Sequence, residues 1–551
     1  MTPLRMREAI RYGNLLLRMR TGRGSPGRTE AGMASGEDPL ESPAETGTVT
    51  TAVPARLDRL PWSRWHWTIV IGLGTVWILD GLEVTLVGNI AGRLSEEGSG
   101  LPITSGQVTG IAAALYVAGA CSGALFFGWL TDRYGRKKLF IITLAVYLAA
   151  TALTALSFST WWFFLCRFFT GFGIGGEYAA INSAIDELIP SKYRGRVDLI
   201  INGSFWLGAV GGSLLAIVML DTDLFAIDLG WRLTFAFGVV FGLVILLVRR
   251  HVPESPRWLF IHGRGDEAEK LVRTAEERIV AEKGGELPPP AGEITIHQRK
   301  SIGFGLIART VFSHYRRRAV LGLSLFIGQA FLYNAITFGF GAILTTFFDV
   351  GTGSTGYFFA VIALGNFFGP LLLGKLFDTV GRRIMISSTY ILSGVLLFVT
   401  AWLFDGGHLT ARTLTACWCV VLFFASAGAS SAYLTVSEVF PMETRAMAIA
   451  FFYAIGTAAG GISGPLIFAR LTESGVVGDT ALAFCIGASL MTLAGLVAVA
   501  LAVPAERRSL EDIAAPLSQR MPGRRDGRES GEGGRGGDGR FGGGTGQGPG
   551  T

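Results

Sequence analysis

Long, continuous apolar runs constrain this chain more than any other feature. Each run reaches the length of about 20 residues that an α-helix needs to cross the hydrocarbon core of a bilayer. The runs are unbroken rather than alternating, which predicts helices and argues against a β-barrel. The chain is 50% hydrophobic and 16% charged, a combination that soluble domains seldom show. Twelve spans are predicted, at residues 67–91, 106–130, 138–158, 161–186, 196–220, 232–250, 318–348, 355–377, 384–404, 411–436, 446–470 and 478–502.

Polar segments separate these spans into two groups of six. The fold class predicted is therefore an all-α membrane protein with two six-helix bundles. The polar end segments are too poor in apolar residues to bury a core, which predicts disorder. The expected parts are a disordered cytoplasmic tail at 1–60, a first bundle at 61–250, a cytoplasmic loop at 251–317, a second bundle at 318–503 and a disordered Gly/Arg-rich cytoplasmic tail at 504–551.

The distribution of charge predicts the orientation and excludes a nucleic-acid partner. The formal net charge is +6, but the basic residues gather in the connections on one side of the spans, while acids dominate the opposite connections. This positive-inside pattern places both termini and the long loop in the cytoplasm. Short external loops and an Ala/Gly/Arg-rich composition indicate a bacterial plasma membrane.

The five Cys lie inside spans with no metal-ligand spacing, so neither a metal nor an organic cofactor is expected.

Three motifs recur in the same order in the second half. "GWLTDRYGRKKLF" at 128–140 reappears as "GKLFDTVGRRIMI" at 374–386. Glu187, Pro190 and Arg194 recur 251 positions later as Glu438, Pro441 and Arg445, and "PESPRWL" at 253–259 recurs as "PAERRSL" at 504–510. Two related bundles in parallel orientation place a substrate site at the bilayer midplane between them.

These motifs resemble those of a known protein family. The first loop matches the G-x-L-x-D-R-x-G-R-[RK] motif of the major facilitator superfamily, at Gly128, Leu130, Asp132, Arg133, Gly135, Arg136 and Lys137. "PESPRWL" and the two E-x-x-P-x-x-x-R segments resemble the sugar-porter and organic-ion/metabolite symporter branches, and the resemblance covers about residues 65–512. It implies secondary transport of a small-molecule substrate by alternating access.

Charged residues at the cytoplasmic ends of both halves predict a gate. Opposite charges at matched positions would close the inner side and separate when the site opens inward; the alternative is that the basic loops only mark topology. Thr379 stands where the first half has Arg133, so an asymmetric gate is expected. The predicted gate residues are Asp132, Arg133, Arg136, Glu187, Arg194, Asp378, Arg383, Glu438 and Arg445.

Two carboxylates lie near the middle of the first span, in "WILDGLEVTLVG". Asp80 and Glu83 are three residues apart and share one helix face. Buried acids in transporters serve as proton relays, and "DGLEV" resembles the D-G-x-[DE] segment of aromatic-acid/proton symporters. The predicted partner is Arg167 in "RFFTGFGIGGEY", which would switch between an acid of the first span and the substrate. The alternative is a permanently neutralised pair that serves assembly only.

Polar and aromatic residues on other spans are the substrate-binding candidates. "GQAFLYNAITF" resembles the sugar-porter stretch Q-Q-x-x-G-x-N, and residues five apart on a regular helix differ by about 140°, so Gln329 and Asn334 would both face a substrate only if that helix is broken. The G-x-G-x-x-G within 171–176 lacks a βαβ context and indicates close helix packing. The full set is Tyr178, Asn182, Asn202, Trp206, Gln329, Asn334 and Tyr453.

The sequence thus predicts a monomeric secondary transporter that couples a small polar organic solute, such as an organic acid, to protons. A sugar or polyol symporter or uniporter is the alternative within transport. A transporter-like sensor without flux is the alternative from another class. A membrane enzyme is disfavoured because no P-loop, nucleophile elbow or metal-ligand cluster is present in the sequence.

Overall fold

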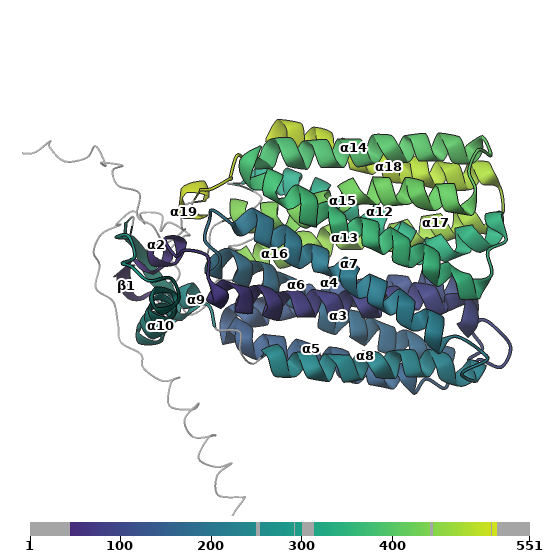
Figure 1. Cartoon of the computed structure of the whole chain (residues 1–551), viewed down its shortest axis with the longest axis horizontal. Coiled ribbons are helices and arrows are strands. Elements are labelled where there is room, and N and C mark those ends of the chain that lie inside the picture. Colours follow the sequence, from purple (N-terminus) through teal and green to yellow (C-terminus); the bar gives the residue numbers. More distant parts are fainter. Residues whose placement is uncertain are drawn as a thin grey trace, which may run out of the picture. The chain divides into compact units, whose positions relative to one another are not determined.

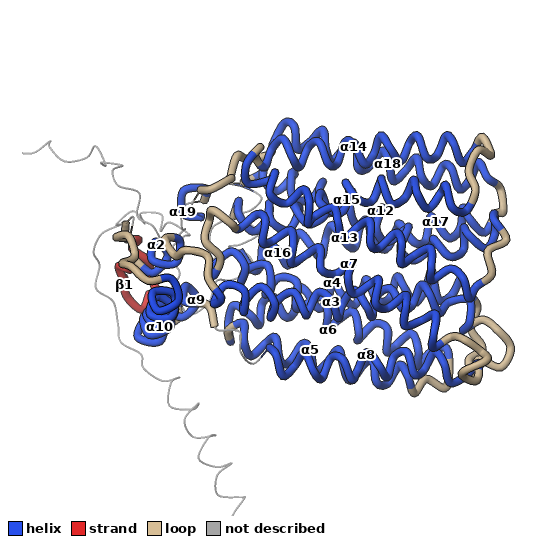
Figure 2. The backbone as a smooth tube through the Cα atoms, viewed as in Figure 1, coloured by secondary structure: helices blue, strands red, loops and turns tan. Residues whose placement is uncertain are grey.

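Long helices that run side by side dominate the protein (Figure 1). The computed structural model describes residues 45–249, 254–290, 292–299, 313, 315–440, 445–508 and 510–514. Figure 2 shows the described part as helix apart from connecting loops and one pair of strands. Eleven described helices are long and apolar enough to cross a membrane, which confirms the all-α membrane fold.

Each predicted span coincides with one long helix or helix run. In the first half these are α3 (Arg64–Leu94), η1 with α4 (Gln107–Ala112, Ala113–Tyr134), α5 (Arg136–Ala155), α6 (Thr160–Leu188), α7 (Arg194–Met219) and α8 (Ile227–Arg249). In the second half they are α12 (Arg316–Phe348), η3 with α13 (Thr352–Ser354, Thr355–Thr379), α14 (Arg382–Asp405), α15 (Ala411–Val439), α16 with η4 and α17 (Arg445–Thr457, Ala458–Ile462, Ser463–Glu473) and α18 (Val477–Leu501). The helix α6, of 29 residues, packs against α4 and α5 and is not among the eleven, so the count of twelve crossings stays a prediction.

The repeated loop motif has one construction in both halves. Gly135 and Gly381 each adopt a positive φ, of 89° and 117°, a conformation that side chains with a Cβ rarely adopt. The helix that follows each glycine receives a carboxylate at its N-terminus: Lys137 N donates to Glu254 at 3.2 Å, and Arg382 N donates to Glu506 at 3.3 Å. Acids at a helix N-terminus satisfy free N–H groups and the helix dipole. This explains why "PESPRWL" and "PAERRSL" recur together with the loop.

The two halves pack most extensively along two helix pairs, α4 against α16 and α7 against α13. Small residues bring these helices close together. A Cβ on Gly128 would lie 2.8 Å from the Cβ of Ala450, and one on Gly203 would lie 2.8 Å from the Pro370 ring. The helices α3, α12 and α15 border the space between these two contacts, so a cavity can form between the halves.

A small module covers one end of the bundle. It consists of β1 (Glu45–Thr51), α2 (Val53–Asp58), α9 (Pro256–Ile261), α10 (Gly265–Lys283) and β2 (Ile294–Arg299). We call these five elements the cap module. Strands β1 and β2 pair antiparallel, and α2 buries Val53 and Leu57 against Trp258, Val272 and Ile279 of α9 and α10.

The cap module corrects the prediction of a disordered tail at 1–60. Residues 45–58 contain β1 and α2, so disorder is wrong for that stretch. The reason is that Val53, Leu57 and Leu60 recur at helical spacing and find an amphipathic partner in α10. The tail at 504–551 also begins with structure, because α19 (Leu510–Ile513) buries Leu510 and Ile513. Residues 1–44 and 515–551 lie outside the described part.

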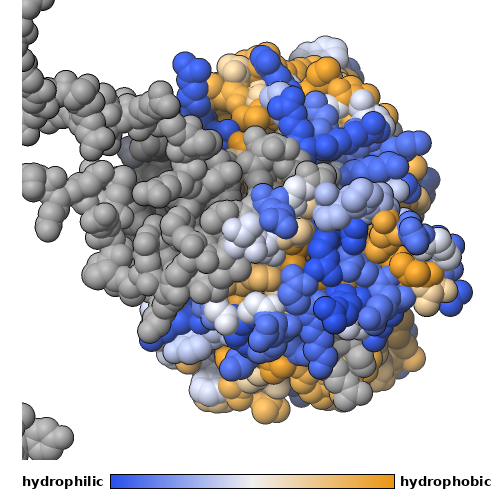
Figure 3. All heavy atoms as spheres, turned by 90° about the vertical axis from the view of Figure 1, so that its left-hand side faces the viewer, coloured by the Kyte–Doolittle hydropathy of each residue, from blue (hydrophilic) through white to orange (hydrophobic). Residues whose placement is uncertain are grey.

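The end of the bundle beside the cap module carries Arg133, Lys137, Arg194, Arg196 and Arg382, and we call it the basic end. Figure 3 looks onto this end together with the cap module and shows hydrophilic residues gathered between hydrophobic surfaces at the rim. This is the end that the sequence predicts to be cytoplasmic.

Candidate functional site

A cavity of about 140 Å³ lies between the two halves. Helices α3, α4, α6 and α7 line it from the first half, and α12, α15 and α16 line it from the second. Rings, amides and hydroxyls make up its polar and aromatic lining, and none of the described lining residues carries a formal charge. The polar and aromatic lining residues are Trp77, Tyr116, Tyr178, Asn202, Phe205, Trp206, Gln329, Tyr333, Asn334, Thr337, Ser426, Ser430, Tyr433, Tyr453 and Thr457.

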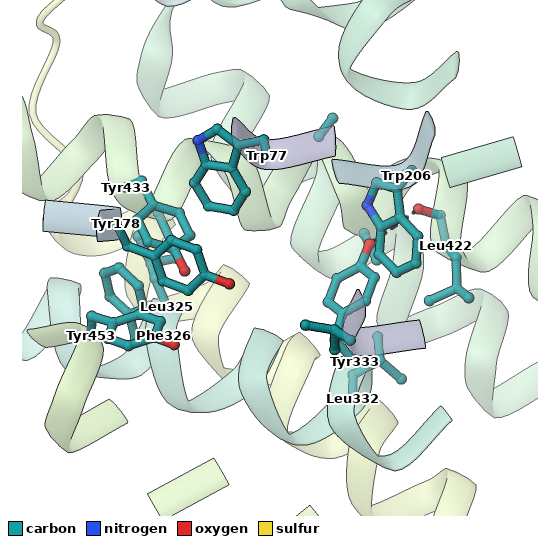
Figure 4. Close-up of a cluster of buried hydrophobic side chains, with 14 of the residues drawn as sticks. Trp77, Tyr178, Trp206, Leu325, Phe326, Leu332, Tyr333, Leu422, Tyr433 and Tyr453 are labelled. Atoms are coloured by element: carbon teal, nitrogen blue, oxygen red, sulfur yellow. Dashed lines mark hydrogen bonds between the residues drawn. The ribbon is translucent and has the colours of Figure 1, made fainter. Parts of the chain in front are cut away.

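Two groups of aromatic side chains lie in the cavity wall (Figure 4). In the first group Trp77 stacks on Tyr178, with ring centroids 4.6 Å apart and planes 4° from parallel. Tyr453 meets Tyr178 edge-on at 5.0 Å, so this group joins the two halves. In the second group Trp206 of α7 lies against Tyr333 of α12, with centroids 5.2 Å apart. A ring-shaped solute can stack between such walls.

Six of the seven predicted substrate-binding residues line the cavity: Tyr178, Asn202, Trp206, Gln329, Asn334 and Tyr453. The seventh, Asn182, lies behind the wall. Its amide donates to the backbone oxygen of Tyr178 at 2.8 Å and accepts from Asn202 at 3.1 Å. The structure therefore gives Asn182 contacts that orient a lining residue.

We expected Gln329 and Asn334 to face a substrate together only if their helix is broken, and this expectation is wrong. Helix α12 continues unbroken from Arg316 to Phe348, yet both amides line the cavity. Ala330, Tyr333 and Thr337 lie between these two residues on the circumference of the helix, and they line the cavity too. A wide arc of α12 faces the space, so residues 140° apart reach it from opposite edges of the arc.

Several lining residues were not predicted, although the repeat contains a signal for some of them. Asn182, Asn202 and Trp206 correspond, 251 positions later, to Tyr433, Tyr453 and Thr457, and all three of these line the cavity. Applying the shift to the first-half candidates finds Tyr433 and Thr457. Trp77 and Tyr116 carry no such signal, because aromatic residues are common in packed helices.

The predicted contact between an acid of α3 and Arg167 is present. Arg167 Nη2 lies 2.9 Å from Glu83 Oε1, and both side chains are buried. Thr151 donates to the same carboxylate at 3.0 Å, and Tyr147 donates to it at 3.5 Å. A buried pair with this many hydrogen bonds offsets part of the cost of removing its charges from water.

The ion pair faces the interior of the first half. Glu83 is surrounded by α5, α6 and α8, and a Cβ on Gly238 of α8 would lie 3.3 Å from its Oε2. Helix α3 presents Trp77 and Val84 to the cavity instead. Asp80 is also buried, and it lies within electrostatic range of the hydroxyls of Tyr116 and Tyr178.

At the basic end an ionic cluster joins the halves. Arg382 contacts Asp378 at 2.8 Å and Glu438 at 3.0 Å. Arg194 of α7 reaches Glu438 at 3.9 Å, and the backbone N–H of Arg196 donates to Asp378 at 2.8 Å. An acid of the second half therefore caps the N-terminus of a first-half helix, which holds the two ends together.

Other predicted gate residues lie elsewhere. Arg383 is wrong as a member of this cluster: its guanidinium is exposed and donates to the Val499 carbonyl oxygen at 2.9 Å. Its neighbour Arg382 takes the buried position, because adjacent helix residues point 100° apart. Glu187 accepts from Ser255, and Arg133 is exposed with its guanidinium 5.9 Å from the Trp129 ring. The side chains of Asp132, Arg136 and Arg445 lie outside the described part.

The family model "Sugar (and other) transporter" matches residues 68–516, which include both halves and the ionic cluster. The chain belongs to this family. The sugar transporter family lies within the major facilitator superfamily, as the sequence motifs indicate. The protein is therefore a multi-pass membrane transporter rather than an enzyme.

Relatives of known name are similar over most of their length. The niacin transporter NiaP of Acinetobacter baylyi is 26% identical over 76% of this chain and 90% of its own. The 4-hydroxybenzoate transporter PcaK of Pseudomonas putida is 25% identical over 73% of this chain and 86% of its own. Among solved structures, the proton:xylose symporter XylE bound to 6-bromo-6-deoxy-D-glucose has a TM-score of 0.65 at 18% identity, covering 82% of this chain and 98% of that chain. This likeness supports the fold.

Proposed function

We propose that this sugar-family transporter is a proton-coupled symporter for a small ring-shaped organic solute, with a planar aromatic acid as the leading class. It would take up the solute by alternating access across a bacterial plasma membrane, with both termini in the cytoplasm. The observation that supports this proposal is an uncharged, aromatic cavity beside a buried carboxylate–guanidinium pair.

The cavity lining favours a flat ring that bears one or two polar groups. Trp77 with Tyr178, and Trp206 with Tyr333, offer ring faces and edges for stacking. Amides and hydroxyls provide both donors and acceptors for the substituents. The named relatives agree with this class, because niacin and 4-hydroxybenzoate are both aromatic acids.

The ion pair explains how a proton and an anion would travel together. When Glu83 binds a proton, the charge of Arg167 loses its counter-charge in a buried site. The positive potential then extends towards the cavity and favours an anionic solute. By thermodynamic linkage the anion favours proton binding to the same degree. The loaded transporter carries a balanced pair of charges.

A sugar or polyol is the second candidate for the solute, and the amide side chains in the cavity lining support it. Asn202, Gln329 and Asn334 line the cavity, and amides suit hydroxyl groups because they donate and accept. The structural likeness to a xylose symporter is one of fold alone.

Purified protein in proteoliposomes separates these candidates. An inward proton gradient should drive accumulation of nicotinate or 4-hydroxybenzoate, and solute addition should carry protons inward. Glu83→Gln should keep solute exchange at equal concentrations but lose gradient-driven accumulation. Accumulation of xylose or myo-inositol would favour the second candidate. Binding of a solute without exchange or proton flux would support a sensor and refute transport.

A further inference from the structure

We infer that Tyr116 links the cavity to the buried ion pair, so that a solute against its ring changes how Arg167 holds Glu83. This inference rests on the proposed proton coupling. Tyr116 lies on α4, a helix that provides neither partner of the ion pair, and the sequence motifs did not identify it. Its role would be positioning, because it acts through Arg167.

The guanidinium of Arg167 lies between two rings and one carboxylate. Its carbon is 5.8 Å from the centroid of Tyr116 and 5.3 Å from that of Phe235, while Nη2 contacts Glu83. Tyr116 also lines the cavity. Phe235 is fully buried in a separate apolar cluster together with Trp231 and Phe163. Of these three described partners of the guanidinium, Tyr116 is the one that a solute can touch.

Glycines in α6 fix Tyr116 in this place. A Cβ on Gly171 would overlap the backbone oxygen of Tyr116, and a Cβ on Gly175 would overlap that of Ala120 one turn further along. Reciprocally, a Cβ on Gly119 of α4 would overlap the backbone oxygen of Phe168. The backbones of α4 and α6 therefore touch on either side of the ring. The G-x-G-x-x-G stretch after Arg167 thus sets the register between the arginine and the cavity wall.

The electron-rich face of an aromatic ring attracts a cation, more strongly where water is excluded. While Glu83 is ionised, the carboxylate is the main partner of Arg167. Once Glu83 is protonated, the ring of Tyr116 becomes the nearest compensation on the cavity side. A solute that stacks on or displaces this ring alters that compensation, so solute occupancy and proton occupancy become coupled.

Other titratable groups surround the pair and would contribute to any pH dependence. They lie on three helices that pack around the ion pair. Substituting them one at a time distinguishes their contributions to the pH dependence from that of Tyr116. They are Asp80 on α3, Tyr147 on α5, and Cys166, Glu177 and Tyr178 on α6. Helix α8 presents Phe235 and Gly238 to the pair, neither of which titrates.

The test compares Tyr116→Leu with Tyr116→Phe, which keeps the ring, using nicotinate and 4-hydroxybenzoate in proteoliposomes. Phe235→Leu is the matched control, since it removes the other ring beside Arg167 without altering the cavity. In Tyr116→Leu, the ratio of gradient-driven accumulation to exchange at equal concentrations should fall at least about fivefold, the lower range of allosteric coupling. Solute affinity, followed by tryptophan fluorescence, should also lose its dependence on pH. Tyr116→Phe should restore both.

The outcomes are separable. Accumulation by Tyr116→Leu at the wild-type level overturns the inference, and so does an equal loss in Phe235→Leu or in Tyr116→Phe. If Tyr116→Leu does not fold, Tyr116→Met replaces it in the same comparison. Absence of proton-driven accumulation in the wild-type protein would instead refute the proposed function.

Discussion

Asp378→Ala should open the basic end of the transporter. In the structure one oxygen of Asp378 binds Arg382 within the second half, and the other accepts from the N–H of Arg196 in the first half. Helix α7 has no side-chain cap of its own, since its N-cap residue Tyr193 makes no such hydrogen bond. Asp378 therefore acts as an N-cap supplied from the other half.

The size of the effect follows from this role. Removing an N-cap acceptor costs about 0.5–2 kcal/mol, and typically ~1 kcal/mol. This interaction exists only while the halves touch at the basic end, so its loss destabilises the closed state alone. A difference of about 1–2 kcal/mol shifts a two-state equilibrium by roughly 5- to 30-fold. The ratio of molecules open to molecules closed at the basic end should rise by that factor.

Distance measurements between two spin labels test this prediction. Lys192 and Lys375 are exposed at the basic end, one in each half, and both can be replaced by cysteine in a background free of the five native cysteines. The long-distance population should grow in Asp378→Ala. Arg383→Ala is the matched control, because Arg383 binds Val499 within its own half. Unchanged distances in Asp378→Ala, or an equal change in Arg383→Ala, would refute the reasoning.

Three further outcomes are expected. Gly175→Ala should lower the Tm strongly, because its Cβ would overlap the Ala120 backbone, whereas Gly211→Ala should be tolerated, since nothing lies within 4 Å of its Cβ; equal Tm values would contradict the packing argument. Burial raises the pKa of Glu276, but hydrogen bonds from Arg56 and Arg59 outweigh this and lower the pKa below its ordinary value of 4.5. The stabilisation of the cap module is then complete above that pH and is lost as pH falls through the lowered value, which limited proteolysis should detect in the wild type and not in Glu276→Gln. Trp206→Ala should weaken solute binding about 2- to 10-fold, the value of one aromatic pair, and an unchanged Kd from titration calorimetry would exclude it from the site.

The membrane spans and the repeat were predictable because they depend on physics that is local in sequence. Apolar length sets the helices, and the tight turn at a glycine with positive φ repeats in both halves. The cap module was not predicted, since α2 is a short helix whose apolar residues gain stability only against α10. A segment of that kind is indistinguishable from a polar tail until its partner is known.

Within the site, the chemical types of the residues were easier to predict than the directions in which their side chains point. Glu83 and Arg167 were found because buried charges need partners, and the structure pairs them. Arg382 was missed in favour of Arg383, because a shift of one residue turns a helix side chain by 100° and sequence alone does not fix the axis. Tyr116 was missed because its position depends on how closely α4 approaches α6.

The layout separates the proposed proton site from the proposed gate and so restricts how they can communicate. The described hydrogen-bond partners of Glu83 are Thr151, Tyr147 and Arg167, all in the first half, whereas the basic end closes through contacts between the halves. Protonation of Glu83 therefore cannot break a gate contact directly. Its effect has to pass through an element that touches both the ion pair and the second half. Helices α3, α4 and α6 meet this condition, and α4 is the one that carries Tyr116 beside Arg167 and packs most extensively against the second half, along α16. The proton site and the solute would then bias the closed state through movement of the same helix.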